Sequence, residues 1–329
     1  MTGQPTFHED AAPALVVDRL TVRVGTVVAV HGISFALAAR RRTGLIGESG
    51  SGKSLTALAL IGLLPEGLSA TGRVLYGGAD LLAASERELC RIRGDRLAMI
   101  FQEPMTALNP VMKVGAQVAE PLRVHRRLGR GEADAAARRA LERVHMPDPA
   151  EKMNAYPHEL SGGQRQRAMI AMATACGPDI VIADEPTTAL DVTVQAQVLD
   201  VLAELVDDGG STLLLITHDL PVVSNVCDVV LVMYGGRIVE EGAVGAVFGQ
   251  PRHPYTRALL DAIPSLDEPA PSRRLRAIPG SVPGVGQFPP GCPFRHRCPR
   301  ADSVCAGMPP LAAVGPDHAH RAACWHPLP

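Results

Sequence analysis

The chain has 329 residues, 46% of them hydrophobic, so it can bury a full core in one large domain with an appendage, or in two domains. Its 32 lysines and arginines nearly balance its 34 aspartates and glutamates, which excludes the strong overall charge of a nucleic-acid binder. The longest apolar runs fall well short of the roughly 20 residues that a spanning helix requires, and residues 1–13 lack the basic-then-apolar order of a secretory signal. We therefore expect a cytosolic chain without a nucleic-acid partner.

Short β-branched runs alternate with helix-compatible stretches from residue 15 to about residue 249, which predicts an α/β domain. The predicted strands are residues 27–30, 43–46, 180–183, 212–216 and 229–233. The last three are continuous apolar runs, as expected of parallel strands that are buried on both faces. Between about residues 105 and 175 strand signals vanish, and alanine, arginine, leucine and glutamate dominate, which predicts a helical insert.

A glycine-rich loop follows the predicted strand 43–46 and precedes a predicted helix over residues 55–62. Its sequence is Gly47-Glu48-Ser49-Gly50-Ser51-Gly52-Lys53-Ser54. Glycines let such a loop curl so that several backbone N–H groups face one anion, and the helix N-terminus adds partial positive charge. Lys53 can then reach the β and γ phosphates of a nucleotide, and the Ser54 hydroxyl can ligate Mg²⁺. A flexible glycine-serine turn is the alternative, but the strand before the loop and the helix after it favour a phosphate site.

Two adjacent carboxylates, Asp184 and Glu185, follow the apolar strand 180–183. At the carboxyl edge of a parallel sheet they would lie beside the phosphate loop. Asp184 suits the Mg²⁺ shell, and Glu185 is placed to polarise the water that attacks the γ-phosphate. A solvated acidic strand end is the alternative, which the phosphate loop earlier in the chain disfavours.

The segment Leu160-Ser161-Gly162-Gly163-Gln164 lies between the glycine-rich loop and the acidic strand end, and it resembles the signature motif of ABC ATPases. A serine and two glycines at a helix start form a second anion cradle, although a simple helix cap is the alternative for an isolated pentapeptide. Three further segments match the same family in order: Phe101-Gln102-Glu103-Pro104, Ala189-Leu190-Asp191 and Thr217-His218-Asp219.

This resemblance covers roughly residues 15–249 and implies a P-loop ATPase domain with a RecA-like parallel core, an antiparallel β part and the helical insert. It implies catalytic roles for Glu185, His218 and Gln102, Mg²⁺ contacts for Ser54, Gln102 and Asp184, and ATP contacts across a dimer for Ser161, Gly162, Gly163, Gln164 and Asp191. ATP and Mg²⁺ are thus the implied substrate and cofactor.

The residue that stacks on adenine stays open. The family usually has an aromatic residue just after the first strand, where this chain reads Thr21-Val22-Arg23-Val24-Gly25. Val24 could pack on the base more weakly, or Arg23 could supply a cationic plane, or the nearby Phe35 plays no part and selectivity for adenine is loose.

Three stretches resemble the ATPases of oligopeptide, dipeptide and nickel importers in particular: residues 101–110, residues 184–191 and His253-Pro254-Tyr255-Thr256-Arg257. The resemblance implies a second, similar ATPase, two transmembrane permease subunits and an extracytoplasmic solute-binding protein, with this chain at the cytoplasmic face of the membrane. The solute stays open between a di- or oligopeptide and a nickel chelate or metallophore. A soluble ABC protein of DNA repair or translation is the alternative of another class. It would normally carry two ATPase domains or a long coiled-coil insert, and the sequence has neither.

Prolines become frequent after residue 249, which divides the chain into an ATPase domain, 13–250, and an extension, 251–329. In a reducing compartment the group Cys292, Cys298, Cys305 and Cys324 favours a metal over disulfides. Four thiolates suit zinc or a four-iron cluster, and the spacing is wider than in most zinc ribbons. Similar importer ATPases hold a [4Fe-4S] cluster, which favours the cluster over zinc, with unligated thiols third. Because the extension has too little apolar content for its own core, we expect the metal to stabilise it, away from the ATP site.

Overall fold

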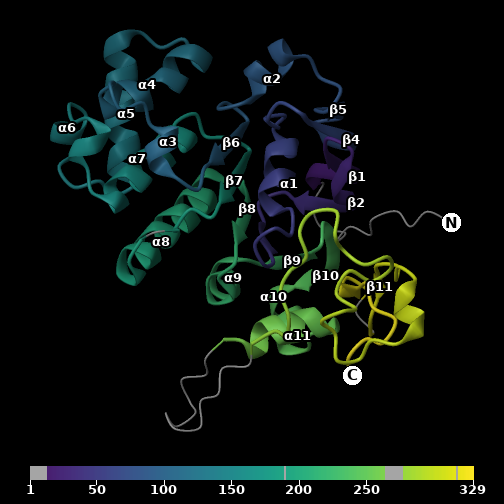
Figure 1. Ribbon diagram of the computed structural model, residues 1–329. Coiled ribbons are helices and arrows are strands. Elements are labelled where there is room, and N and C mark those ends of the chain that lie inside the picture. Colours follow the sequence, from purple (N-terminus) through teal and green to yellow (C-terminus); the bar gives the residue numbers. More distant parts are fainter. Residues whose placement is uncertain (1–12, 189, 264–276, 316–317) are drawn as a thin grey trace, which may run out of the picture.

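The computed structural model describes residues 13–188, 190–263, 277–315 and 318–329 (Figure 1). Some residues lie outside the described ranges: residues 1–12, Ala189 of the segment Ala189-Leu190-Asp191, and Pro264, Pro269 and Pro271 of the extension. No helix in the described ranges is long and apolar enough to cross a membrane.

An eight-stranded sheet runs through the molecule in the order β11-β12-β10-β9-β3-β8-β7-β6. Its parallel strands are β9 (Val229–Tyr234), β3 (Arg42–Ile46), β8 (Thr212–Thr217), β7 (Ile180–Asp184) and β6 (Leu97–Ile100). Four of these five strands were predicted and are confirmed. The strand β6 was not predicted, because a run of only four residues gives a weak periodic signal. The strand β10 (Arg237–Ala243) pairs antiparallel with β9 and leads to the edge of the sheet.

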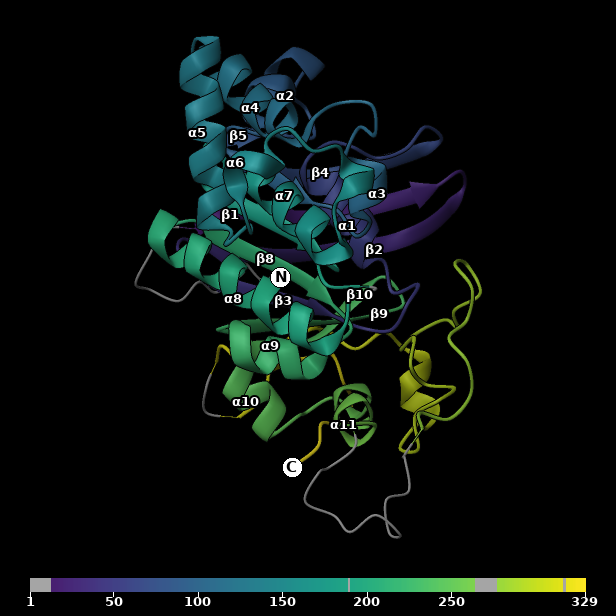
Figure 2. The same ribbon diagram turned by 90° about the vertical axis from the view of Figure 1, so that its left-hand side faces the viewer.

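Both faces of the parallel strands are buried, which explains their continuous apolar runs. In β7, Val181 and Ala183 belong to one apolar cluster, and Ile180 and Ile182 belong to the other. The helices α8 (Val192–Gly209), α9 (Leu220–Val226) and α10 (Val244–Gly249) contribute to the first cluster, and α1 (Lys53–Leu60) contributes to the second (Figure 2).

The second sheet is antiparallel, in the order β2-β1-β4-β5, and it packs with α1 on the central sheet. Its strands are β1 (Pro13–Val24), β2 (Val27–Ala38), β4 (Leu68–Tyr76) and β5 (Ala79–Asp80). The short helix α2 (Glu86–Ile92) follows it. The predicted strand 27–30 is the start of β2, which continues through alternating buried residues to Ala38.

The helical insert is confirmed, and the described residues 105–175 contain no strand. It forms a lobe beside the two sheets (Figure 1). Its helices are α3 (Pro104–Ala107), α4 (Val114–His125), α5 (Arg130–Arg143), α6 (Pro149–Lys152), the 3-10 turn η1 (Pro157–Glu159) and α7 (Gly162–Thr174). Val118, Ala137 and Ile170 bury the contact between α4, α5 and α7.

The extension packs onto the central sheet instead of standing apart from it. Its elements are α11 (Pro254–Asp261), η3 (Ser303–Ala306), β11 (Ala312–Ala313) and β12 (Arg321–Ala322). The strand β12 pairs with β10, so the extension lengthens the sheet of the ATPase domain. Tyr255 and Phe294 lie with their ring centroids 4.6 and 5.3 Å from that of Tyr234 on β9. The extension thus completes its apolar core with side chains of the ATPase domain.

Candidate active site

The glycine-rich loop connects the carboxyl end of β3 to α1, as predicted, and α1 begins at Lys53, two residues earlier than expected. Gly47 has φ of 153°, and a Cβ atom there would lie 2.1 Å from the carbonyl oxygen of Met233 on β9. Gly52 has φ of 99° and is the N-cap of α1. Because only glycine adopts these conformations without strain, the loop can curl tightly over the carboxyl edge of the sheet.

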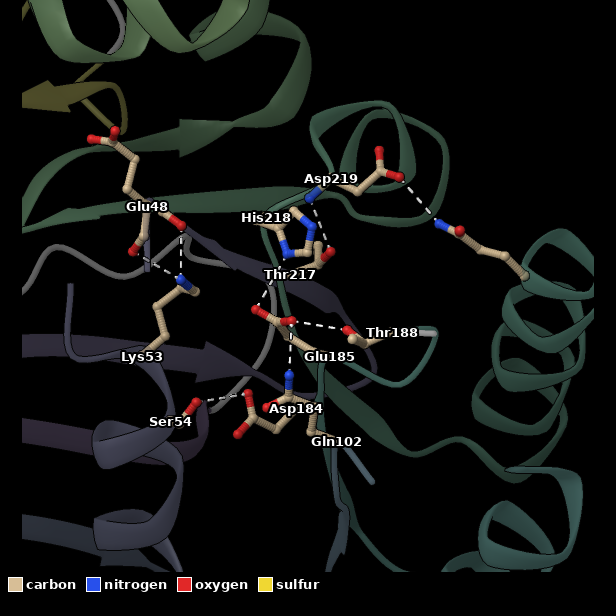
Figure 3. Close-up of polar contacts among 12 residues, drawn as sticks. Glu48, Lys53, Ser54, Gln102, Asp184, Glu185, Thr188, Thr217, His218 and Asp219 are labelled. Carbon is tan, nitrogen blue, oxygen red and sulfur yellow. Dashed lines mark hydrogen bonds and ion pairs between the residues drawn. The ribbon is translucent and has the colours of Figure 1, made fainter. Parts of the chain in front are cut away.

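A cavity of ≈ 280 Å³ opens at this loop. It is lined by Ala29, Ser49, Gly50, Gly52, Lys53, Ser54, Leu55, Gln102, Glu185 and Val285. The Lys53 ammonium donates hydrogen bonds to the carbonyl oxygens of Gly47 at 2.7 Å and Glu48 at 3.2 Å (Figure 3). Burial lowers the pKa of Lys53, and the carboxylates of Glu185 and Asp184 oppose that shift. Ser51 is buried within the loop and does not line the cavity.

Ser54 and Asp184 meet beside the cavity, where the Ser54 hydroxyl donates to the Asp184 carboxylate at 3.2 Å (Figure 3). Burial raises the pKa of Asp184, while the Ser54 hydrogen bond lowers it. A buried carboxylate beside a hydroxyl offers the oxygen ligands that Mg²⁺ prefers. The residues present therefore fit the predicted metal site.

Glu185 is the centre of a second group of polar side chains (Figure 3). Its φ is 46°, a left-handed conformation that costs energy in a residue with a side chain and concentrates at functional sites. Its carboxylate contacts His218 Nδ1 at 3.3 Å, and it accepts hydrogen bonds from Thr188 Oγ1 at 2.9 Å and Gln102 Nε2 at 3.4 Å. The structure thus brings together the three residues predicted as catalytic, with His218 and Gln102 at the carboxylate of Glu185.

Thr188 was not predicted as a site residue. The available signal was its place three residues after Glu185, which lets a turn bring its hydroxyl back to the carboxylate. The sequence analysis used this stretch only for family resemblance.

The second predicted anion cradle lies at the N-terminus of α7. Ser161 caps the helix, with its hydroxyl accepting from the Gln164 N–H at 3.3 Å, and Gln164 Oε1 accepts from the Ser161 N–H at 3.0 Å. Ser161 and Gly162 are exposed, and a Cβ at Gly163 would lie 2.6 Å from Val194 of α8. None of these four residues lines the cavity at Lys53. The N-terminus of α7 therefore does not contribute to the cavity at Lys53.

Asp191 also lies outside the cavity lining, and it caps α8 by accepting a hydrogen bond from the Val194 N–H at 3.0 Å. Asp219, next to His218, caps α9 and accepts a hydrogen bond from Gln195 of α8 at 3.1 Å. The contact between α8 and α9 thereby fixes the backbone on which His218 is carried.

The turn between β1 and β2 has no aromatic residue. Val24 is 41% exposed at the end of β1, whereas Phe35 is buried in the core. Arg23 donates a hydrogen bond back to the carbonyl oxygen of Thr26 at 3.5 Å. Both candidates for the base, Val24 and Arg23, are exposed, and neither lines the cavity at Lys53.

The expectation that the extension lies away from the ATP site is wrong. Val285 of the extension lines the cavity, and Arg297 forms an ion pair with Glu48 of the glycine-rich loop at 2.7 Å. These contacts span most of the chain, so no local pattern in the sequence could indicate them.

The four cysteines of the extension line one small enclosed space and form no disulfide. Burial raises the pKa of Cys324 to about 11 and also raises the pKa values of Cys292 and Cys298. Zinc, with Zn–S bonds of about 2.3 Å, would hold its sulfur ligands about 4 Å apart. Within the described ranges, the one group of three or more potential ligand atoms within 4.8 Å is Asp302, Cys305 and His326. The cysteine sulfurs are therefore spread more widely than a single zinc ion requires.

Residues 30–188 match the family model described as ABC transporter, and residues 239–305 match the model described as oligopeptide/dipeptide transporter, C-terminal region. A protein of Sinorhizobium fredii named "Probable peptide ABC transporter ATP-binding protein" is 50% identical over 300 residues, covering 90% of this chain and 89% of that protein. The oligopeptide transport ATP-binding protein OppD of Salmonella typhimurium is 48% identical over 304 residues, covering 92% and 90%. The chain belongs to the ATP-binding proteins of peptide ABC transporters.

Solved structures agree with this assignment of the fold. The ATP-binding cassette MJ0796, in a dimeric post-hydrolysis state bound to ADP and Pi, matches 70% of this chain and 98% of its own length, with a TM-score of 0.63 and 26% identity. The ATP-binding cassette fold of this chain is therefore established.

Proposed function

We propose that this ATP-binding protein hydrolyses ATP to drive the import of di- or oligopeptides. The observation that carries the proposal is the separation of two anion sites: Lys53 lines the nucleotide cavity, and the exposed Ser161 helix start does not. Each half is incomplete alone and is complemented by the opposite half of another ATPase. A related cassette is dimeric with ADP and Pi bound, which supports this arrangement.

In the proposed reaction, Glu185 is the general base that orients and polarises the attacking water. His218 and Gln102 lie 3.3 and 3.4 Å from its carboxylate. From there His218 would contact the γ-phosphate and Gln102 would contribute to the Mg²⁺ site. Ser54 and Asp184 would hold Mg²⁺, which would neutralise charge on the phosphates. Thr188 fixes the carboxylate of Glu185 through its 2.9 Å hydrogen bond.

The ATP-binding role requires partners. A second, similar ATPase supplies the helix start that corresponds to Ser161 of this chain and completes the nucleotide site at Lys53. Asp191 lies at the contact between the two ATPases. Two permease subunits form the membrane path, and an extracytoplasmic binding protein delivers the solute. This chain binds to the permeases at the cytoplasmic face of the membrane. No nucleic acid is involved.

The extension, which we divide from the ATPase domain at residues 250 and 251, holds a metal. We propose that Cys292, Cys298, Cys305 and Cys324 bind a [4Fe-4S] cluster. Their soft thiolate character and their wide spacing support the cluster, and zinc is the alternative. Because the ligands must be thiolates, cluster binding would release protons, and it would stabilise the folded extension, in which Cys292 and Cys305 are buried and Cys298 and Cys324 are half-buried.

The identity of the solute can be tested with the complete transporter in proteoliposomes. We expect ATP hydrolysis to rise when a binding protein loaded with peptide is added, and to stay at its basal rate with a nickel chelate. Stimulation by the chelate alone would favour the metallophore importer. Hydrolysis that is independent of the permeases would favour a soluble ABC ATPase.

A further inference from the structure

We propose that the extension is a working part of the ATP site: Arg297 positions the glycine-rich loop through Glu48, and Val285 forms an apolar wall for the base. The inference rests on the proposed function only in requiring that ATP binds at Lys53. It makes Arg297 a positioning residue, because it acts through the loop and does not itself line the cavity.

Arg297 is held firmly in the extension. Its side chain is buried, with 8% of the residue exposed. The guanidinium donates to the Pro279 carbonyl at 2.8 Å and to the Tyr234 hydroxyl at 3.2 Å, and it lies over the Phe294 ring at 5.9 Å. Its remaining N–H groups meet both carboxylate oxygens of Glu48, at 2.7 and 3.1 Å. A planar guanidinium fixed on its other sides sets the position of a bidentate carboxylate partner.

Glu48 transmits that position to the phosphate site. Its side chain turns away from Lys53, while its carbonyl oxygen accepts from the Lys53 ammonium (Figure 3). Its N–H donates to the hydroxyl of Tyr255, which also belongs to the extension, at 2.8 Å. The extension therefore holds Glu48 by both its backbone and its side chain. The lysine that meets the phosphates is bonded to that same residue.

Charge adds a second effect. Glu48 carries a negative charge within the loop that binds an anion. While it is paired with Arg297, that charge is neutralised locally. Without Arg297, an uncompensated carboxylate would remain near the phosphates and oppose their binding.

Val285 offers apolar surface at the cavity, where this chain lacks the aromatic residue that the family usually stacks on adenine. It is 47% exposed and lines the cavity together with Ala29 of β2. Its neighbour Gly286 lies so close to Val27 of β2 that a Cβ there would be 2.7 Å from a Val27 methyl group. The loop of the extension thus packs on the start of β2, next to the turn that follows Val24. Apolar side chains from both parts take the place where the family uses an aromatic ring.

The test measures equilibrium binding of a fluorescent ATP analogue to the full-length chain, with Arg257→Met as the matched control. Arg257 is exposed on α11 and is also in the extension. We expect Arg297→Met to weaken binding about tenfold, the effect of losing charge-assisted hydrogen bonds, and Arg257→Met to leave it unchanged. Combining Arg297→Met with Glu48→Gln should restore part of the affinity, because the unpaired charge is removed.

Unchanged affinity in folded Arg297→Met would overturn the inference. If that variant does not fold, Arg297→Lys replaces it, since it keeps the charge but loses the bidentate geometry; weaker binding supports the inference, and wild-type binding contradicts it. Val285→Ser should lower the affinity for ATP several-fold but leave the affinity for inorganic tripolyphosphate, measured by competition, unchanged. An equal loss of affinity for both ligands would show that Val285 does not contact the base. Lys53→Ala separates the two levels. If it weakens binding by about 100-fold while Arg297→Met leaves the affinity unchanged, the inference fails and the proposed function stands.

Discussion

The ATPase core and the extension contribute to the same cavity in different ways. In the core, each functional side chain lies at the end of a strand or the start of a helix, inside a short motif: Lys53 follows β3, Glu185 follows β7 and His218 follows β8. In the extension, Arg297 reaches a partner that is 249 residues away in the sequence. Chemistry carried by local motifs can be located from the sequence, whereas support carried by long-range contacts becomes visible only when the chain is folded.

The largest effect should come from the core, by replacing Glu185 with glutamine. The amide keeps the shape and the contact with Thr188 but cannot accept a proton, so hydrolysis in the assembled transporter should fall by about 10²–10⁴-fold. ATP binding should persist. Single-turnover measurements with radiolabelled ATP would check both. Turnover near the wild-type rate would remove Glu185 from the role of base.

Lys53→Ala should weaken ATP binding by about 100-fold, because it removes the buried cation that faces two phosphates, and hydrogen bonds to charged groups contribute about 1.5–3 kcal/mol each. Isothermal calorimetry on the full chain would measure the affinity. Wild-type affinity in this variant would contradict the assignment of the whole cavity.

The junction between core and extension should be sensitive to Glu240→Gln. Glu240 on β10 is fully buried and accepts from the N–H groups of Arg252 at 2.6 Å and His253 at 2.9 Å, and it contacts His320 at 2.8 Å. In glutamine one carboxylate oxygen is replaced by an NH₂ group, which would face a backbone N–H, so two donors would meet without an acceptor. We therefore expect a loss of about 2–4 kcal/mol in the free energy of unfolding. Denaturant titration would measure it, with exposed Glu66→Gln as the control. Equal stability of the two variants would mean that the extension docks without this contact.

The smallest effect joins the metal site to the ATP site. Protein purified without oxygen should be brown and contain about four irons per chain, and Cys298→Ser should remove the colour. Because Cys298 follows Arg297 directly, ATP affinity should also fall a few-fold, whereas exposed Cys90→Ser should change neither property. Colourless protein with one zinc ion per chain would show that the four cysteines bind zinc instead of the cluster, with the same structural role. Loss of colour without any change in ATP affinity would show that the cluster and the loop are independent.

Much of the core could be predicted because its signals are short-range. Three strands of the parallel sheet were found from their continuous apolar runs, and β3 was found as a short run that leads into the glycine-rich loop. The helical insert was found from its composition. Asp184 and Glu185 were expected beside the glycine-rich loop because parallel strands end at one edge of the sheet, whereas Gln102 and His218 were expected from the family motifs. The length of β2 was missed, since its alternation of buried and exposed residues is interrupted.

The extension resisted prediction for a physical reason. Its prolines break local periodicity, so its fold is decided by β12 pairing with β10 and by aromatic contacts with Tyr234. Composition indicated correctly that it lacked apolar content for an independent core. It could not indicate that the missing apolar surface would come from the ATPase domain.

The central claim is that this chain carries two halves of an ATP site that are completed only by a partner ATPase. The most direct test is the specific rate of ATP hydrolysis by the isolated chain at increasing dilution, compared with the rate per site in the assembled transporter. The account predicts slow hydrolysis that falls further on dilution, and much faster hydrolysis in the complex. An equal specific rate in dilute monomer and complex would contradict it.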